Sequence, residues 1–147
     1  MQRVSSARVI VDGDTVGEIG AGILALVGAA KGDTEQDAEA VADKTMNLRI
    51  FQDNAGKMNL SLLDKGGELL VVSQFTLLAD CTKGRRPSFF EAMDPEPAAE
   101  LVERFAAYAK SRGVKVGRGV FGASMEVELV NDGPVTIVLD SAERRKK

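Results

Sequence analysis

The chain of 147 residues, 44% apolar and 28% charged, is long enough to bury a core as one domain. It has no histidine and one cysteine, Cys81, which excludes catalytic histidine dyads, zinc sites built on histidine or several thiolates, and internal disulfides. A net charge of −3 argues against broad nonspecific binding to nucleic acid but permits a local basic patch. Without a signal-peptide core or an apolar run of membrane-spanning length, the chain is expected to be cytoplasmic, with no membrane contact.

The first third of the sequence predicts a hairpin, a buried strand and a helix. Gln2–Val11 and Thr15–Ile19 are strands on either side of a short Asp-Gly-Asp turn. Ile23–Gly28 is continuously apolar, as expected of a strand buried on both faces. Asp33 is the expected N-cap of the helix, with Gln36 closing a capping box. The apolar face of this helix consists of Ala38, Val41, Ala42 and Met46.

Glu68–Leu78 is the strongest strand prediction in the chain. It is apolar at first and becomes polar towards its end. A period of two places Ser73 and Phe75 on one face. It places Gln74 and Thr76 on the other face. Polar side chains at the end of a buried strand either hydrogen-bond within the fold or line a cleft, and the residues alone leave both possibilities open.

The remaining middle segments predict a strand, a polar loop and a second helix. Lys57–Leu63 is a strand, and the loop after residue 78 contains Cys81, which is more often incidental than nucleophilic without a histidine to activate it. Phe89–Phe90 is expected in the core. A helix begins at Asp94 or the following proline and ends before Gly113.

Two basic clusters, Lys83–Arg86 and Arg144–Lys147, stand out from the acidic total. Most such runs are solvated surface. We expect the folded domain to span residues 1–141, followed by a basic tail over residues 142–147 that is disordered.

Met125–Val138 predicts a final hairpin with Asn131–Gly133 as its tight turn, because Asn, Asp and Gly tolerate positive φ. Pro134 has no N–H to donate to a ladder, which suits the first residue of a strand. A trans proline is the commoner state, although a Gly–Pro bond is also a candidate for a cis peptide. Bare backbone at Gly133 would allow a ligand to approach closely.

Many strands with two well-separated helices indicate an α/β fold. We expect a single compact domain with a mixed, strongly curved, barrel-like β-sheet and two main helices.

Ser73–Leu77 and Asn131–Thr136 together closely resemble the two signature motifs of the D-aminoacyl-tRNA deacylases. The likeness covers almost the whole chain and extends to Gln2–Val4, Gly17–Gly20, Gly56–Asn59 and Arg86–Phe89. Members of that family usually carry several more residues before the Gln-Arg-Val stretch, so either the first strand is shorter here or the start site is misassigned.

The resemblance implies a homodimer with its active sites at the interface. It implies hydrolysis of the ester of D-aminoacyl-tRNA, and of mischarged glycyl-tRNA, without a metal or cofactor. Gly133 and Pro134 would form a cis motif that enters the pocket of the partner, and Arg3 would brace it. The implied pocket residues are Ser73, Gln74, Phe75 and Thr76, with Met125 beside them.

An aminoacyl ester is already activated, so its hydrolysis needs oxyanion stabilisation and a placed water more than a strong nucleophile. Backbone N–H groups near Phe75 and Thr76 would supply the oxyanion contacts, and the 2′-hydroxyl of the substrate would act as base or proton shuttle. Thr76 as covalent nucleophile is the competing mechanism, which would suit a hydrolase of other small esters. A non-catalytic tRNA-binding module resembling an editing domain is the remaining alternative.

Overall fold

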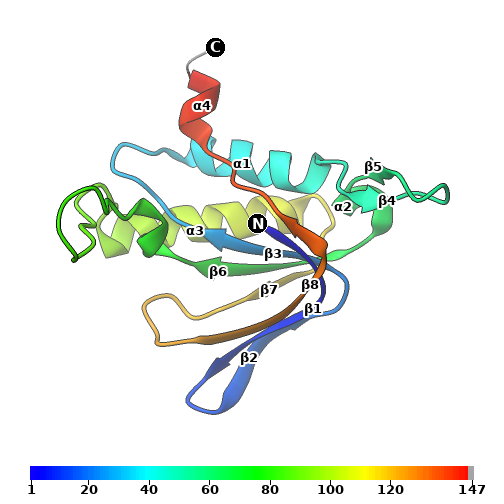
Figure 1. Cartoon of the computed structure of the whole chain (residues 1–147), viewed down its shortest axis with the longest axis horizontal. Coiled ribbons are helices and arrows are strands. Elements are labelled where there is room, and N and C mark those ends of the chain that lie inside the picture. Colours follow the sequence, from blue (N-terminus) through cyan, green and yellow to red (C-terminus); the bar gives the residue numbers. More distant parts are fainter. Residues whose placement is uncertain (146–147) are drawn as a thin grey trace.

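The computed structural model describes residues 1–145, with side chains described through Glu143. Figure 1 shows a strongly curved sheet with the two long helices on one side of it. The elements in chain order are β1 (Gln2–Val11), β2 (Asp14–Ile19), β3 (Gly22–Val27), α1 (Glu35–Asn47), β4 (Phe51–Gln52), β5 (Met58–Leu60), α2 (Leu62–Lys65), β6 (Glu68–Ser73), the 3-10 helix η1 (Phe75–Leu78), α3 (Pro95–Ser111), β7 (Val116–Arg118), β8 (Glu126–Thr136) and α4 (Ser141–Arg145).

β1 is the centre of the sheet because three strands pair with it. Along one edge it pairs first with β3 and then with β2, and along the other it pairs with β8, all antiparallel. β3 and β6 are parallel, as are β6 and β7. The barrel nearly closes where β2 approaches β7: a Cβ on Gly17 would lie 2.2 Å from the carbonyl oxygen of Arg118, so only glycine fits there. The predicted mixed, barrel-like α/β fold is confirmed.

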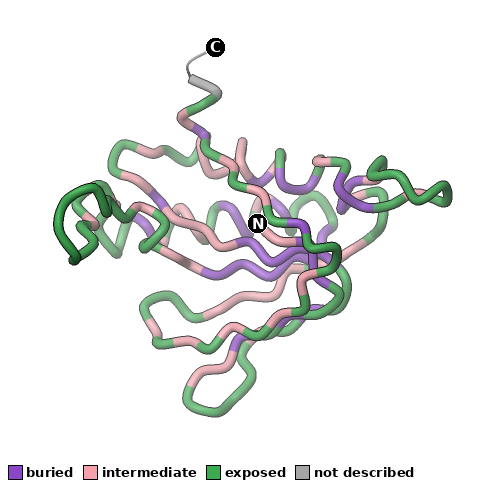
Figure 2. Tube along the Cα trace, in the orientation of Figure 1, coloured by how far each residue is buried: buried purple, intermediate pink, exposed green. Residues whose placement is uncertain are grey.

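Two apolar clusters share the sheet between them, which explains why β3 is apolar along its length and β6 is apolar from Leu69 to Val72 (Figure 2). Ile23 and Leu69 point towards α1 and α3, whereas Leu24 and Leu70 point into the barrel. Successive side chains of a strand face opposite sides, so both faces of these strands are buried. The predicted buried strand is therefore confirmed, with Gly22–Val27 as its bounds in place of Ile23–Gly28.

The predicted N-cap of the first helix is wrong by one residue. Thr34 is the N-cap, and its hydroxyl accepts the N–H of Asp37, whose carboxylate accepts the N–H of Thr34. Asp33 instead accepts the N–H of Ala30 in the preceding turn, so it is not free to cap. Gln36 therefore plays no part in the capping box.

Two predicted strands are too long. β5 ends at Leu60 because Ser61 caps α2 in a second capping box, with Asp64 as its partner. β6 ends at Ser73, since Gln74 takes φ −147° and ψ 78° and turns the backbone into the 3-10 helix η1. The period-two assignment of faces therefore does not hold beyond Ser73.

The predicted hairpin over Met125–Val138 is also wrong, because β8 is a single strand that pairs with β1 on both sides of the Asn-Asp-Gly-Pro segment. Val4 pairs with Asn131 and Gln2 pairs with Thr136, so two steps along β1 face five steps along β8. The surplus residues of β8 form a bulge, which absorbs the Asn-Asp-Gly-Pro segment that would otherwise make a turn.

Three further predictions concern single segments. Phe90 is 73% exposed and Phe89 only half-buried, so neither belongs to the core. The second helix begins at Pro95 with Asp94 as its N-cap, and Gly113 follows its end with φ +86°, as predicted. The tail over residues 142–147 is described only through Arg145, as part of α4. Residues 146–147 lie outside the described residues, so disorder of the tail and the 1–141 domain boundary stay predictions.

Among residues 1–145, no helix is long and apolar enough to cross a membrane.

Candidate active site

The polar segment after β6 begins where the sheet ends. The last backbone hydrogen bond to β3 joins the N–H of Gln74 to the carbonyl of Val27 at 2.8 Å. The first bond of η1 then joins the N–H of Leu77 to the carbonyl of Gln74 at 3.2 Å. The N–H groups of Phe75 and Thr76 lie between these two bonds, at the start of a helix, where backbone donors have no partner within the helix. They are therefore available to an oxyanion.

Phe75 is 57% exposed, which is unusual for a phenylalanine next to a buried strand. Its ring meets that of Phe89 edge to face, with centroids 5.0 Å apart and an interplanar angle of 72°. Phe89 is held there by a backbone bridge between Asp80 and Ser88, with N–O distances of 2.7 and 2.9 Å. An exposed, fixed aromatic ring beside free backbone donors suits a ligand with a flat ring and an oxyanion.

The hydroxyl of Thr76 accepts a hydrogen bond from Nε2 of Gln74. Thr76 is exposed, and among the described residues no side-chain base contacts its hydroxyl. The chain has no histidine to play that part. Ser73 is half-buried at the end of β6, opposite Val27. This arrangement can bind and orient a substrate, but it does not activate Thr76 as a nucleophile.

Met125 lies close to the same end of β6. The N–H of Gly119 donates to the carbonyl of Val71 at 3.0 Å, and a Cβ on Gly119 would lie 2.7 Å from the Met125 sulfur. Met125 is half-buried against the barrel cluster. Met125 therefore lies in the connection between β7 and β8, near Val71 of β6, and its place beside the Ser73–Thr76 segment stays a prediction.

The second group of predicted site residues surrounds the bulge of β8. The Gly133–Pro134 peptide bond is cis, which confirms that expectation, and both residues are exposed. The side chain of Asn131 holds the bulge by accepting the N–H of Val135 at 2.8 Å and donating to the hydroxyl of Thr136 at 3.0 Å. The residues alone did not suggest this role for Asn131, although an Asn that precedes a turn-like segment is a common local brace.

Arg3 supports the bulge from beneath. Its side chain is buried, with Nε donating to the carbonyl of Asp132 at 2.9 Å and Nη1 donating to the carbonyl of Ile50. A Cβ on Gly133 would lie 2.9 Å from Arg3 Nη2. Arg3 therefore packs against the backbone of Asp132 and Gly133, and its role in bracing a ligand-binding motif stays a prediction.

Within one chain, the two groups lie at opposite ends of the sheet. Asn131 pairs with Val4, Val4 with Gly22, and Gly22 with Glu68, the first residue of β6. Ser73 is the last residue of that strand. Five residues of extended chain separate the two ends by roughly 16 Å at about 3.3 Å per residue.

Comparisons with known proteins agree on one family. The family model described as D-Tyr-tRNA(Tyr) deacylase matches residues 1–140. A protein of Roseiflexus castenholzii named "D-aminoacyl-tRNA deacylase" is 61% identical over 142 residues, which cover 97% of this chain and 90% of that protein. A protein of the same name from Thermomicrobium roseum is 61% identical over 145 residues, covering 99% and 94%. The solved structure of "c-Myc DNA Unwinding Element Binding Protein" superposes with a TM-score of 0.88 at 40% identity and 95% coverage of both chains.

Proposed function

The chain belongs to the D-Tyr-tRNA(Tyr) deacylase family, and from that premise we propose that two copies of it form each active site. The chain is a hydrolase of the ester bond of D-aminoacyl-tRNA, which releases the free D-amino acid and the tRNA. The observation that carries this function is the match of the family model to residues 1–140, which include both motif segments. We place the activity in the cytoplasm, where aminoacyl-tRNA is used.

The separation of the two groups of site residues supports the shared site. Gly133 and Pro134 are exposed and braced, yet they face no pocket formed by their own Phe75 and Thr76. In a two-fold dimer, the bulge of one chain enters the Phe75 site of the other, and the same contact recurs at the second site. Each chain therefore supplies one half of each of two equivalent sites.

The chemistry follows from which groups are present. A water molecule attacks the ester carbonyl, and the N–H groups of Phe75 and Thr76 stabilise the oxyanion that develops. The bond to the ribose 3′-oxygen then breaks, and that oxygen takes the proton lost by the water. No histidine exists to carry this proton, so the 2′-hydroxyl of the terminal adenosine carries it. The flat rings of the adenosine suit the exposed face of Phe75.

The site selects D-aminoacyl esters by excluding the side chains of L-amino acids. Gly133 of one chain presents bare main chain to the site of the other, and this backbone excludes an L side chain by its bulk. A D side chain points away from it. Glycine has no side chain to exclude, so mischarged glycyl-tRNA is also hydrolysed.

The direct test is a deacylation assay with D-Tyr-tRNA, L-Tyr-tRNA and Gly-tRNA, each measured against hydrolysis without enzyme. We expect rapid loss of the D-tyrosyl and glycyl esters and no acceleration for the L-tyrosyl ester. Equal rates for D- and L-Tyr-tRNA would contradict rejection by Gly133. D-tyrosine methyl ester is the control for a general esterase, because hydrolysis of this ester as fast as D-Tyr-tRNA would show that the RNA is not recognised.

A further inference from the structure

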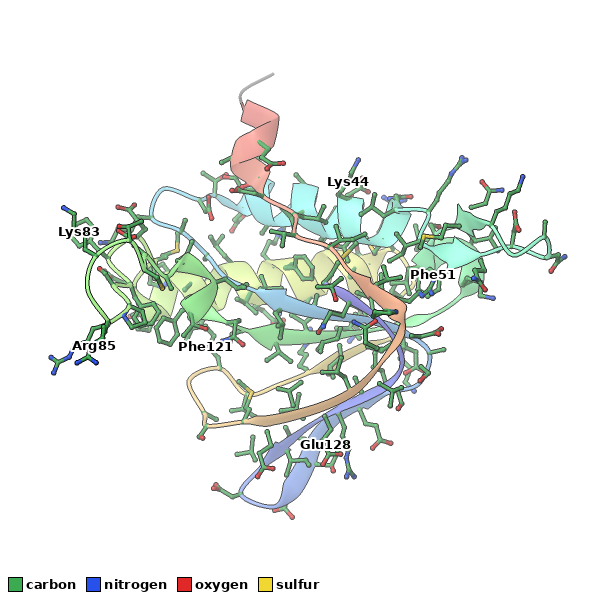
Figure 3. The ribbon with its side chains drawn as sticks, viewed as in Figure 1. Lys44, Phe51, Lys83, Arg85, Phe121 and Glu128 are labelled. Atoms are coloured by element: carbon green, nitrogen blue, oxygen red, sulfur yellow. The ribbon has the colours of Figure 1, made fainter. Side chains whose placement is uncertain are left out.

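A basic loop over residues 81–87 projects from the end of the molecule that carries η1. The bridge between Asp80 and Ser88 closes its base, and Gly84 at its tip has φ +70°. The carboxylate of Asp80 accepts the N–H of Thr82, and this backbone bond lowers the pKa of Asp80. The loop is therefore held at its base while its tip stands in solvent. Figure 3 shows the side chains of Lys83 and Arg85 directed away from the body of the protein.

The charges of this loop have no carboxylate partner among the side chains that the structure describes, residues 1–143. Lys83, Arg85 and Arg86 are exposed and line a shallow hollow, and segment 81–90 contains no acidic residue. Among the described side chains, none of the three forms a salt bridge. Five other cations at the surface, four exposed and Arg118 half-buried, are paired with carboxylates: Arg8, Arg104, Arg112, Lys115 and Arg118. Three unpaired cations on a protein of net charge −3 form a local site for an anion with several charges.

Both ends of the loop are joined to residues of the candidate site. It leaves η1 a few residues after Phe75, and it returns through Ser88 to Phe89, whose ring contacts that of Phe75. A further cation, Lys31, lies at the same end, with Nζ 3.7 Å from the centre of the exposed Phe90 ring. A nucleotide held at Phe75 would therefore have its neighbours along the strand within reach of the loop.

We propose that Lys83, Arg85 and Arg86 bind the phosphodiester backbone of the acceptor end of the tRNA while its terminal adenosine occupies the Phe75 site. This inference rests on the proposed function, and it adds the part of the substrate that the ester chemistry does not use. Backbone contacts position a nucleic acid without reading its sequence, and each releases counterions from the phosphates. The loop therefore sets affinity for tRNA and its dependence on salt, and leaves the chemical step unchanged.

The test uses the double variant Lys83→Gln/Arg85→Gln, which removes two charges from the loop tip. The matched control is Lys44→Gln/Lys110→Gln, which removes two exposed charges from α1 and α3. Each protein is assayed on D-Tyr-tRNA and on 3′-O-(D-tyrosyl)adenosine, which carries no phosphate. Binding of uncharged tRNA is followed by fluorescence anisotropy between 50 and about 200 mM salt, the range over which phosphate contacts are strongly screened.

The loop variant is expected to bind tRNA about tenfold more weakly and to raise KM for D-Tyr-tRNA similarly, with kcat unchanged. The slope of log affinity against log salt should become shallower by roughly 1.4 to 1.8, because each of the two lost phosphate contacts contributes about 0.7 to 0.9 to that slope. Hydrolysis of the adenosine ester should be unchanged, and the control variant should behave as wild type in every assay.

Wild-type affinity and salt slope in the loop variant would overturn the inference. Equal losses on both substrates would also overturn it, because the loop would then support the site rather than bind phosphate. Failure of the proposed function would give a different result, because wild type would then hydrolyse neither ester. The anisotropy comparison still decides the role of the loop in that case.

Discussion

Thr76 is the residue at which two mechanisms make opposite predictions. Its hydroxyl is held by Gln74, and among the described side chains no base contacts it. Thr76→Ala should therefore keep single-turnover hydrolysis of D-Tyr-tRNA within about tenfold of wild type. Replacing the 2′-hydroxyl of the terminal adenosine by hydrogen should cost on the order of a hundredfold or more, if that group carries the proton. An inactive Thr76→Ala with normal turnover of the deoxy substrate would make Thr76 the nucleophile.

Gly133 should tolerate substitution less well than Thr76. Its φ of +135° is one that side-chain-bearing residues rarely adopt, and an added Cβ would lie 2.9 Å from both Arg3 Nη2 and Val135 Cγ2. We expect Gly133→Ala to lower kcat/KM for D-Tyr-tRNA by about a hundredfold and stability by about 1–3 kcal/mol. Thermal unfolding separates the two effects, and activity equal to that of Thr76→Ala would contradict the role given to Gly133.

At the scale of elements, the sequence predicts well those segments whose side chains all face a core. β3 and β6 were predictable because both faces are apolar, and α3 because its apolar stripe has clear boundaries at Pro95 and Gly113. β8 was not, because the Asn131–Pro134 segment has the composition of a turn. The pairing with β1, which is distant in sequence, keeps it in one bulged strand.

The candidate site, too, could be predicted only in part from the sequence. The motif residues could be named from the sequence, but the turn at Gln74 and the contact of Phe75 with Phe89 could not. A phenylalanine is more often buried than exposed, so composition placed Phe89 in the core. The separation of Gly133 from Phe75 within one chain depends on strand register, which no local pattern encodes.

The capping box of α2 predicts an acid-sensitive element. Asp64 accepts the backbone N–H of Ser61, and this bond lowers its pKa below the usual value near 3.8. The folded pKa is thus below the unfolded pKa, so this contribution to stability is complete above about pH 4 and is lost as pH falls through the folded value. Asp64→Asn should lower the Tm at pH 7 and reduce the further fall in Tm between pH 5 and pH 3.

Asp14→Asn is the matched control for Asp64→Asn, since Asp14 is exposed on β2 and its carboxylate accepts no hydrogen bond from the described residues. It should leave both the Tm at pH 7 and the acid profile close to wild type. An acid profile for Asp64→Asn that matches wild type would contradict the role of this carboxylate.

At the scale of the whole molecule, the shared site requires an assembly of two chains. A closed two-fold dimer uses the same surface on both chains, and a stable one buries on the order of 1,200–2,000 Å² in total. Light scattering at micromolar concentration should give about twice the 15.6 kDa mass of the chain. A monomer that remains fully active at that concentration would contradict the shared site.

The most direct test of the shared site combines two impaired variants in one dimer. Gly133→Ala impairs the half of the site carried by β8, and Phe75→Ala impairs the half carried by η1 by removing the exposed ring. In the heterodimer, the intact Phe75 of one chain meets the intact Gly133 of the other at one of the two sites.

The two variants are co-expressed with different tags, the heterodimer is isolated through both tags, and its initial rate on D-Tyr-tRNA is compared with those of wild type and of each variant homodimer. The shared site predicts that the heterodimer recovers about half of the wild-type rate, because one of its two equivalent sites is intact. A heterodimer no more active than the mean of the two homodimers would show that each chain forms its site alone.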